Sequence, residues 1–232
     1  MSNLNKRKVI CCTDSNSVIN VPNTGAKKSK SNSIQEIYTK TYKEFPYENE
    51  HYSALRAVYQ WASVNTEAID HVLYPGSYVH IVPSLLFKNV VYIDNCKGKV
   101  DKFFSKESRS HLNDIVTPSE DLKVYDGQAE ITFYHEDFTN SKHLKLKKEI
   151  KKYDLLISLS ASGKIPKSCY NNVRENGLLY VNDDFGDACV AMASPTDWCL
   201  IGVIDKMNPT ILTLDPIVCN SYFNNIKTSL PY

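Results

Sequence analysis

The sequence lacks any apolar run of the roughly 20 residues that a membrane-spanning helix needs, and its first residues lack the apolar stretch of a secretory signal. Its seven cysteines are scattered without a Cys-x-x-Cys pair, which argues against a disulfide framework or a structural zinc site. The chain also lacks an excess of charge of either sign, since it has 27 basic and 26 acidic residues. A chain this close to neutral has no overall electrostatic field to attract nucleic acid or a membrane, so we predict neither as a partner. Unpaired cysteines are typical of reduced thiols, which predict a cytoplasmic protein, and no metal site is expected.

The 232 residues are 42% hydrophobic, which is enough for one sizeable α/β core. Residues 1–33 are rich in Ser, Asn and Lys without a sustained period, and we predict a flexible N-terminal tail there, although Val9–Cys12 could form one short strand. Deleting residues 1–30 should then leave thermal stability nearly unchanged. Residues 34–62 show helical periodicity on both sides of a Phe45-Pro46 break and predict two N-terminal helices. Residues 63–232 form the predicted α/β domain.

Strands and helices alternate through this domain. A helix is expected over Lys99–Phe104, a surface helix over Asn140–Lys152, and a further helix from Pro166 to Gly177. The expected strands are Val72–Tyr74, Val90–Ile93, Ala129–Tyr134, Leu155–Leu159, Leu178–Val181, Trp198–Ile204 and Thr210–Leu214. The loop between the last two strands is too short for a parallel crossover, so they predict an antiparallel hairpin. The expected fold is a Rossmann-like three-layer sandwich with a mostly parallel, seven-stranded sheet.

The stretch from His71 to Cys96 is typical of a nucleotide-binding βαβ unit. An apolar run ends at a turn around Gly76, and a second apolar run ends on Asp94, 18 residues later. Such a turn lets backbone N–H groups approach a ligand, and a carboxylate at the tip of the second strand can accept hydrogen bonds from ribose hydroxyls.

These features resemble the class I S-adenosylmethionine-dependent methyltransferases, over roughly residues 62–215. Tyr74-Pro75-Gly76-Ser77 resembles the glycine turn, Asp94 the ribose-binding acid, and Glu136-Asp137-Phe138 the segment that contacts adenine. In that family the sheet has seven strands, the last inserted antiparallel. The resemblance implies that S-adenosylmethionine is the cofactor and a small molecule the methyl acceptor. The cofactor-binding residues that it implies are Tyr74, Pro75, Gly76, Ser77, Asp94, Asn95, Asp137, Phe138, Ser158 and Ser160.

The chain also departs from the family pattern. Tyr74 stands where the first motif usually has an acidic residue, and Gly76 is the only glycine of the turn. The base-gripping Asn-Pro-Pro-Tyr motif is absent after the fourth strand, which argues against methylation of a nucleobase amino group. A non-catalytic relative that acts through a protein partner therefore stays open. A nicotinamide-dependent oxidoreductase ranks third, because it predicts more glycines and a sixth parallel strand where this chain has a hairpin.

No catalytic residue stands out. Asn182-Asp183-Asp184 follows the fifth strand and could bind a metal or act as a general base, or could be a polar turn with an aspartate capping the next helix. His80 and His135 lie near strand ends, where a histidine is either a base or a structural hydrogen bonder. No Gly-x-Ser-x-Gly elbow is present, which argues against hydrolase chemistry.

Overall fold

The computed structural model describes residues 6–13, 51–105, 112, 122–140, 144, 152–161 and 163–227, the last four of these by their backbone alone. No helix among these residues is long and apolar enough to cross a membrane. The strands are β1 (Arg7–Thr13), β2 (His71–Pro75), β3 (Asn89–Asp94), β4 (Glu130–His135), β5 (Tyr153–Ser158), β6 (Val173–Asn182), β7 (Trp198–Asp205) and β8 (Leu212–Thr213). The helices are α2 (Tyr52–Asn65), α3 (Pro83–Leu86), α4 (Lys99–Phe103), α7 (Ile165–Ser168), α8 (Asp187–Met192) and α9 (Pro216–Lys227), with a 3₁₀ turn at Tyr170–Asn172.

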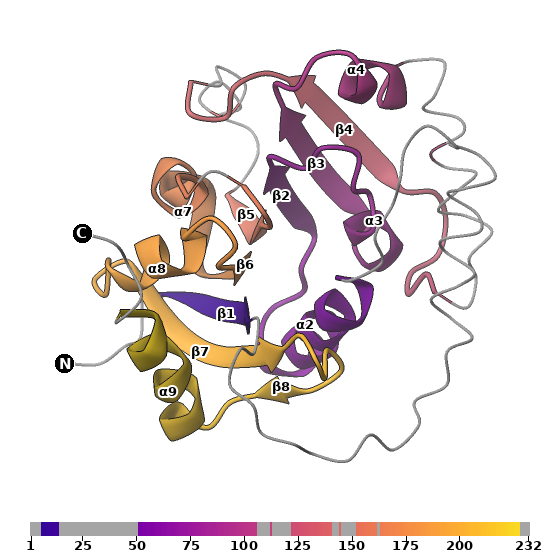
Figure 1. Ribbon diagram of the computed structural model, residues 1–232. Helices are drawn as coiled ribbons and strands as arrows, with labels where there is room; N and C mark the ends of the chain where they lie inside the picture. Colours follow the sequence, from indigo (N-terminus) through magenta and orange to yellow (C-terminus); the bar gives the residue numbers. More distant parts are fainter. Residues whose placement is uncertain are drawn as a thin grey trace.

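The strands form one sheet in the order β4-β3-β2-β5-β6-β1-β7-β8, and all neighbours are parallel except β7 and β8 (Figure 1). Helices cover both faces: α2, α3 and α4 lie on one side and α7, α8 and α9 on the other (Figure 1). The predicted Rossmann-like sandwich with a mostly parallel sheet and a C-terminal antiparallel hairpin is confirmed. Its fully buried strands explain the continuous apolar runs in the sequence, because both faces of such a strand meet helices.

The eighth strand comes from the N-terminus. β1 lies between β6 and β7 and runs parallel to both, and the side chains of Val9, Ile10 and Cys11 are completely buried. Arg7 anchors the first residue of β1 to the neighbouring segments. Its Nε donates to the Val173 carbonyl at 2.8 Å, and its guanidinium lies 3.7 Å above the Tyr170 ring. The prediction of a flexible tail is therefore wrong for residues 7–13, because ladders on both sides hold a strand too short to be recognised alone. Residues 14–33 lie outside the described part.

The C-terminal hairpin lies at the edge of the sheet. β8 pairs with β7, while β1 takes the place in which the methyltransferase resemblance implied an inserted antiparallel strand. Gly202 lets the hairpin close, because a Cβ there would lie 2.6 Å from Leu212 Cδ1 and 3.0 Å from Leu214 Cδ2.

One helix prediction needs correction, and two others lie wholly or mostly outside the described residues. The helix expected from Pro166 to Gly177 ends at Ser168, and Gly177 lies inside β6. There Asn176 has φ +59°, and a Cβ on Gly177 would lie 2.9 Å from the Arg174 carbonyl oxygen. Asn-Gly thus forms a turn-like irregularity within a strand, which a sequence pattern cannot distinguish from a helix end. The second of the two expected N-terminal helices is α2; the first lies outside the described residues, as does most of the helix predicted over 140–152.

Candidate functional site

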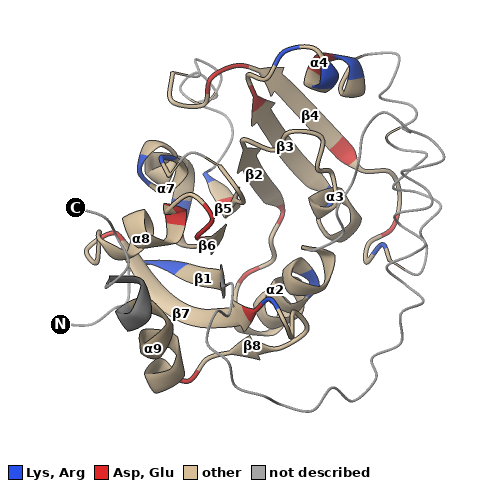
Figure 2. Ribbon diagram, in the orientation of Figure 1, with Lys and Arg blue, Asp and Glu red and all other residues tan. Residues whose placement is uncertain are grey.

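The sheet changes its winding direction between β2 and β5. From β2 the chain moves outward through β3 to β4, whereas from β5 it moves the other way to β6. Ligands of open α/β sheets bind outside the carboxyl ends of the strands at such a switch point. Acidic residues lie at the end of β3 and in the segments that follow β4 and β6 at this edge (Figure 2). The candidate site is therefore the group of loops after β2, β3, β4, β5 and β6.

The loop after β2 is a tight turn. Gly76 has φ +65°, and its N–H donates to the Ile93 carbonyl at 2.7 Å. A Cβ on Gly76 would lie 3.3 Å from the Cβ of Ala161, so the loop after β5 packs closely against this face of the glycine. Tyr74 and Ser77 are buried. The glycine is thus needed for its left-handed backbone and for the close approach of a neighbouring loop.

Asp94 ties the tips of β2 and β3 together. Its Oδ2 accepts the Tyr78 N–H at 2.8 Å and its Oδ1 accepts the Cys96 N–H at 2.7 Å. The carboxylate therefore holds Tyr78 at φ +47°, a left-handed conformation that costs energy for a residue with a Cβ. An ionised carboxylate has about four acceptor positions. Each oxygen of this buried group consequently keeps a lone pair after bonding one backbone N–H.

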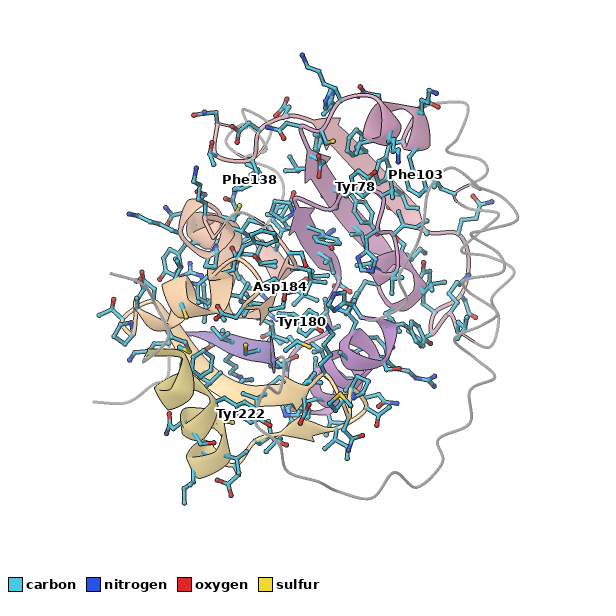
Figure 3. The ribbon with its side chains drawn as sticks, viewed as in Figure 1. Tyr78, Phe103, Phe138, Tyr180, Asp184 and Tyr222 are labelled. Atoms are coloured by element: carbon cyan, nitrogen blue, oxygen red, sulfur yellow. The ribbon has the colours of Figure 1, made fainter. Side chains whose placement is uncertain are left out.

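The loop after β4 adds a second carboxylate. Among the described residues, both hydrogen bonds to the Asp137 side chain reach Oδ1, from the Thr139 N–H at 2.8 Å and the Thr139 hydroxyl at 2.7 Å. These bonds favour the ionised form and lower the pKa of the exposed Asp137 carboxyl. Phe138 packs partly against the cluster under α7 and α8, and Asn95 is exposed. Figure 3 shows Phe138 and Tyr78, which come from the loops after β4 and β2.

A hydrogen-bond network joins the loops after β5 and β6. The Ser160 N–H donates to Asn182 Oδ1 at 2.9 Å, and the Ser160 hydroxyl donates to Asp184 Oδ2 at 2.6 Å. Asn182 Nδ2 also donates to Asp184 Oδ2, at 2.7 Å. Ser160 has φ +47°, so this network holds a second left-handed non-glycine residue at the switch point. Asp184 itself is exposed and labelled in Figure 3.

Asp183 has a structural partner. Its carboxylate accepts the Cys189 N–H at 3.0 Å and the Cys189 thiol at 3.3 Å, which satisfies one of the unpaired donors in the first turn of α8. Of the two readings left open for this aspartate, the structure thus shows the helix-capping contact. No group of three or more His, Cys, Asp or Glu within the described ranges could hold a metal ion.

Ser158 lies deeper than its neighbour Ser160. Ser158 and Asp187 are both completely buried and lie next to each other, but neither the Ser158 hydroxyl nor Asp187 Oδ1 forms a hydrogen bond within the described part of the chain. Asp187 Oδ2 accepts the Gly163 N–H at 3.0 Å and so fixes the entry to α7. Burial is the largest influence on this carboxyl and raises its pKa overall. Ser158 is therefore enclosed by the fold, whereas Ser160 is exposed.

This arrangement predicts how stability depends on Asp187. Because its folded-state pKa is raised above the unfolded value of about 3.9, stability is lost as the pH rises through the folded pKa. Asp187→Asn keeps an acceptor for the Gly163 N–H and places no charge at this buried position, so its free energy of unfolding should stay within about 1 kcal/mol of the wild type, whereas Asp187→Ala should lose about 2–3 kcal/mol. Urea unfolding at about pH 3.5, below the unfolded pKa, and at about pH 8 checks this. A wild type whose stability relative to Asp187→Asn is the same at both values would contradict it.

Polar rings gather below the loop after β2, where sequence patterns had indicated only His80. Tyr74 Oη and His80 Nδ1 are hydrogen-bonded at 3.0 Å. The His51 ring, at the start of α2, lies edge-on to His80 at 5.8 Å and to Tyr180 of β6 at 6.5 Å between ring centroids. Burial, followed by the neighbouring His51, lowers the pKa of His80 to about 3. His80 is consequently neutral at physiological pH, while His135 forms a separate pair with Asp101 at 2.8 Å.

Sequence reasoning missed His51 and Tyr180, because residues from α2, β2 and β6 meet only in the folded chain. The residues that it did select lie mostly in loops at one edge of the sheet. At or near the tips of β2 and β3 lie six of the predicted residues: Tyr74, Pro75, Gly76, Ser77, Asp94 and Asn95. Two more, Asp137 and Phe138, follow β4, and Ser160 is hydrogen-bonded to the loop after β6. Ser158 is completely buried next to Asp187, the first residue of α8.

No protein-family model matches this chain, and no curated protein sequence is significantly similar to it. Solved structures with a similar arrangement include an S-adenosylmethionine-dependent methyltransferase from Clostridium acetobutylicum, with 15% identity, 64% of this chain and 56% of that chain covered, and a TM-score of 0.39. A second is the N-methyltransferase NodS from Bradyrhizobium japonicum in complex with S-adenosyl-L-homocysteine (11% identity, 64% and 72% covered, TM-score 0.36). A third is the plantazolicin methyltransferase BpumL, also with that ligand (11%, 77% and 54%, 0.27). Likenesses this distant carry no argument about activity, and the chain spans little more than half the length of the first protein.

Proposed function

We propose that the protein binds S-adenosylmethionine across the tips of β2, β3 and β4 and transfers its methyl group to a small-molecule acceptor. The observation that carries this proposal is the position of Asp94. It lies at the end of the second strand of the βαβ unit, beside the topological switch point, and contacts the turn after the first strand. Its carboxylate keeps acceptor capacity for two hydroxyls, as a ribose ligand requires, so the residues fit a nucleoside cofactor.

Two carboxylates would bind different parts of the cofactor. Asp94 would accept hydrogen bonds from the ribose hydroxyls, and Asp137 from the adenine amino group. When bound, the cofactor supplies a methyl group that is already activated by the sulfonium. The protein then needs mainly to hold the acceptor in line. The network of Ser160, Asn182 and Asp184 offers an oriented carboxylate for this purpose at the adjacent strand tips.

One observation favours a second candidate, a non-catalytic methyltransferase-like protein. The space beside Gly76 is taken by Ala161, and buried Ser77 and left-handed Tyr78 occupy positions where the family motif usually has small residues. A crowded turn would weaken binding of the methionine part of the cofactor. The third candidate, a nicotinamide-dependent oxidoreductase, lacks its glycine fingerprint, although β7 is itself a parallel strand and strand direction no longer argues against it.

Cofactor binding tests this proposal directly. Calorimetric titration should show saturable binding of S-adenosylmethionine and of its demethylated product to the wild type. Asp94→Ala removes the ribose acceptor and frees Tyr78, so the dissociation constant should rise by about 5–150-fold, or about 1–3 kcal/mol. Glu175→Ala is the matched control, because this exposed carboxylate lies near the start of β6, at the opposite end of the strand. An unchanged affinity in Asp94→Ala would exclude the ribose role, and no binding by the wild type at millimolar ligand would favour the non-catalytic candidate.

A further inference from the structure

The turn after β2 uses most of its backbone donors within the protein. Of the five N–H groups from Gly76 to His80, three form internal hydrogen bonds: Gly76 donates to the Ile93 carbonyl at 2.7 Å, Tyr78 to Asp94 Oδ2 at 2.8 Å, and His80 to the Ser77 carbonyl at 3.0 Å. The other two belong to Ser77 and Val79, which are both buried. The turn of a nucleotide-binding βαβ unit normally offers such groups to the anionic part of a ligand. This turn has little left to donate.

The turn also carries no charge. Residues 74–81 include no acidic residue, lysine or arginine, and neither do residues 155–161 of the adjacent strand and loop. Burial and the nearby Asp94 carboxylate raise the pKa of Tyr74, whose hydroxyl is hydrogen-bonded to His80 at 3.0 Å. Burial lowers the pKa of His80 to about 3, so both side chains are neutral at physiological pH. A carboxylate or phosphate would thus lose its hydration in this turn without gaining an opposite charge.

The two carboxylates on the nucleoside side of the site keep acceptor positions. Asp94 accepts one backbone N–H on each oxygen and retains a lone pair on each for ribose hydroxyls. The Asp137 side chain accepts both of its hydrogen bonds in the described part of the chain on Oδ1, which leaves Oδ2 for an adenine amino group. The acceptors thus match a nucleoside, whereas the turn lacks the donors that an anionic group on the 5′ carbon would need.

The acidic character of this edge of the sheet increases the difference. Asp94 lies at the end of β3, and Glu136 and Asp137 follow β4 (Figure 2). Hydrogen bonds from Thr139 lower the pKa of Asp137, which keeps this carboxyl ionised at neutral pH. Carboxylates around the nucleoside repel a 5′-phosphate, but they do not repel an uncharged 5′ substituent.

We propose that the site recognises the adenosine part of its ligand and gains little affinity from the group on the 5′ carbon. The ligand class is a nucleoside with an uncharged 5′ substituent, such as the thioether 5′-methylthioadenosine, and not a nucleotide. Recognition of adenosine rests on the proposed function only in the position that Asp94 and Asp137 give to the nucleoside. It applies to the catalytic and the non-catalytic candidate alike.

Calorimetric titration of the full chain with three probes tests this proposal: S-adenosyl-L-homocysteine, 5′-methylthioadenosine and adenosine 5′-monophosphate. The first two share the nucleoside and the thioether sulfur, and only the first carries the amino-acid group. Their dissociation constants should agree within about tenfold, because the amino-acid group meets neither free donors nor opposite charge in the turn. The monophosphate should bind at least about tenfold more weakly than 5′-methylthioadenosine, because the carboxylates repel its phosphate.

A pair of variants shows whether both thioethers are held through the nucleoside. Asp94→Ala should weaken the binding of S-adenosyl-L-homocysteine and of 5′-methylthioadenosine by the same factor, because the ribose is common to both. Glu175→Ala, an exposed position near the start of β6, should change neither affinity. A factor that differs more than about tenfold between the two thioethers would contradict recognition through adenosine.

Three further results would overturn the proposal. If S-adenosyl-L-homocysteine binds more than about tenfold tighter than 5′-methylthioadenosine, the amino-acid group is recognised; the proposed function then stands without this inference. If the monophosphate binds as tightly as 5′-methylthioadenosine, for instance through Lys164, which lies near Asp137, the site accepts nucleotides. If no probe binds at millimolar concentration, the proposed function fails together with the recognition of adenosine.

Discussion

Val9→Asp is expected to unfold the protein or to lower its free energy of unfolding by about 4 kcal/mol or more. Val9 is completely buried in β1, and β1 supplies ladder bonds to both β6 and β7. An aspartate at this position would place a carboxylate in the cluster under α7 and α8. Deletion of residues 1–13 should be at least as damaging, because it would separate β7 and β8 from the rest of the sheet.

The same substitution at an exposed valine provides the control. Val64→Asp, in the last turn of α2 where the side chain is 82% exposed, should cost less than about 1 kcal/mol. Urea unfolding of both variants measures the difference. A Val9→Asp protein as stable as Val64→Asp would mean that β1 is a dispensable tail, as the composition of residues 1–33 had suggested.

Acidification is expected to destabilise the protein through His80. The pKa of this histidine is lowered from about 6.5 to about 3 by burial and by His51. The unfolded state takes up a proton below pH 6.5 while the folded state does not, so stability is present in full above the unfolded pKa and falls as the pH decreases toward 3. The loss is about 1.4 kcal/mol per pH unit, or about 2 kcal/mol at pH 5.

His80→Asn isolates this contribution. Asparagine removes the titratable ring at the position that contacts Tyr74. The variant should be less stable at pH 7 because it loses packing, but its stability should change by about 2 kcal/mol less than that of the wild type between pH 7 and pH 5. His135→Asn is the control, since this exposed ring pairs with an exposed carboxylate, and it should keep the wild-type dependence through His80. Equal slopes for the wild type and His80→Asn would show that His80 titrates normally.

The sequence was most informative where structure depends on local pattern. The strands from β2 to β8 lie close to their predicted positions, except that β6 begins at Val173 instead of Leu178, because each combines an apolar run with a turn signal. Gly76 and Asp94 could be placed at the tips of adjacent strands for the same reason. Parallel strands joined by a short crossover put their carboxyl ends at one edge, so the site loops followed from the order of elements alone.

Local pattern failed where partners far apart in the chain decide the outcome. Pro166 and Gly177 are typical helix boundaries, yet the chain between them turns into β6, because pairing with β5 and β1 outweighs these signals. Ser158 and Ser160 look equivalent in sequence, but Ser158 is buried at the end of β5 while Ser160 is exposed in the following loop. Asp94 was expected to contact a ligand, and only the folded chain reveals that it also holds the Tyr78 backbone.

The sequence by itself therefore determined the α/β class, the succession of strands along the chain from β2 onward and the loops of the candidate site. These depend on periodicity and turn chemistry within short windows of sequence. Only the tertiary structure decided that β1 fills the sheet between β6 and β7 and that His51, His80 and Tyr180 meet in one cluster. The physical reason is that a strand gains its hydrogen bonds from neighbours rather than from itself. A run of four apolar residues in a lysine-containing segment does not indicate which strands it will pair with.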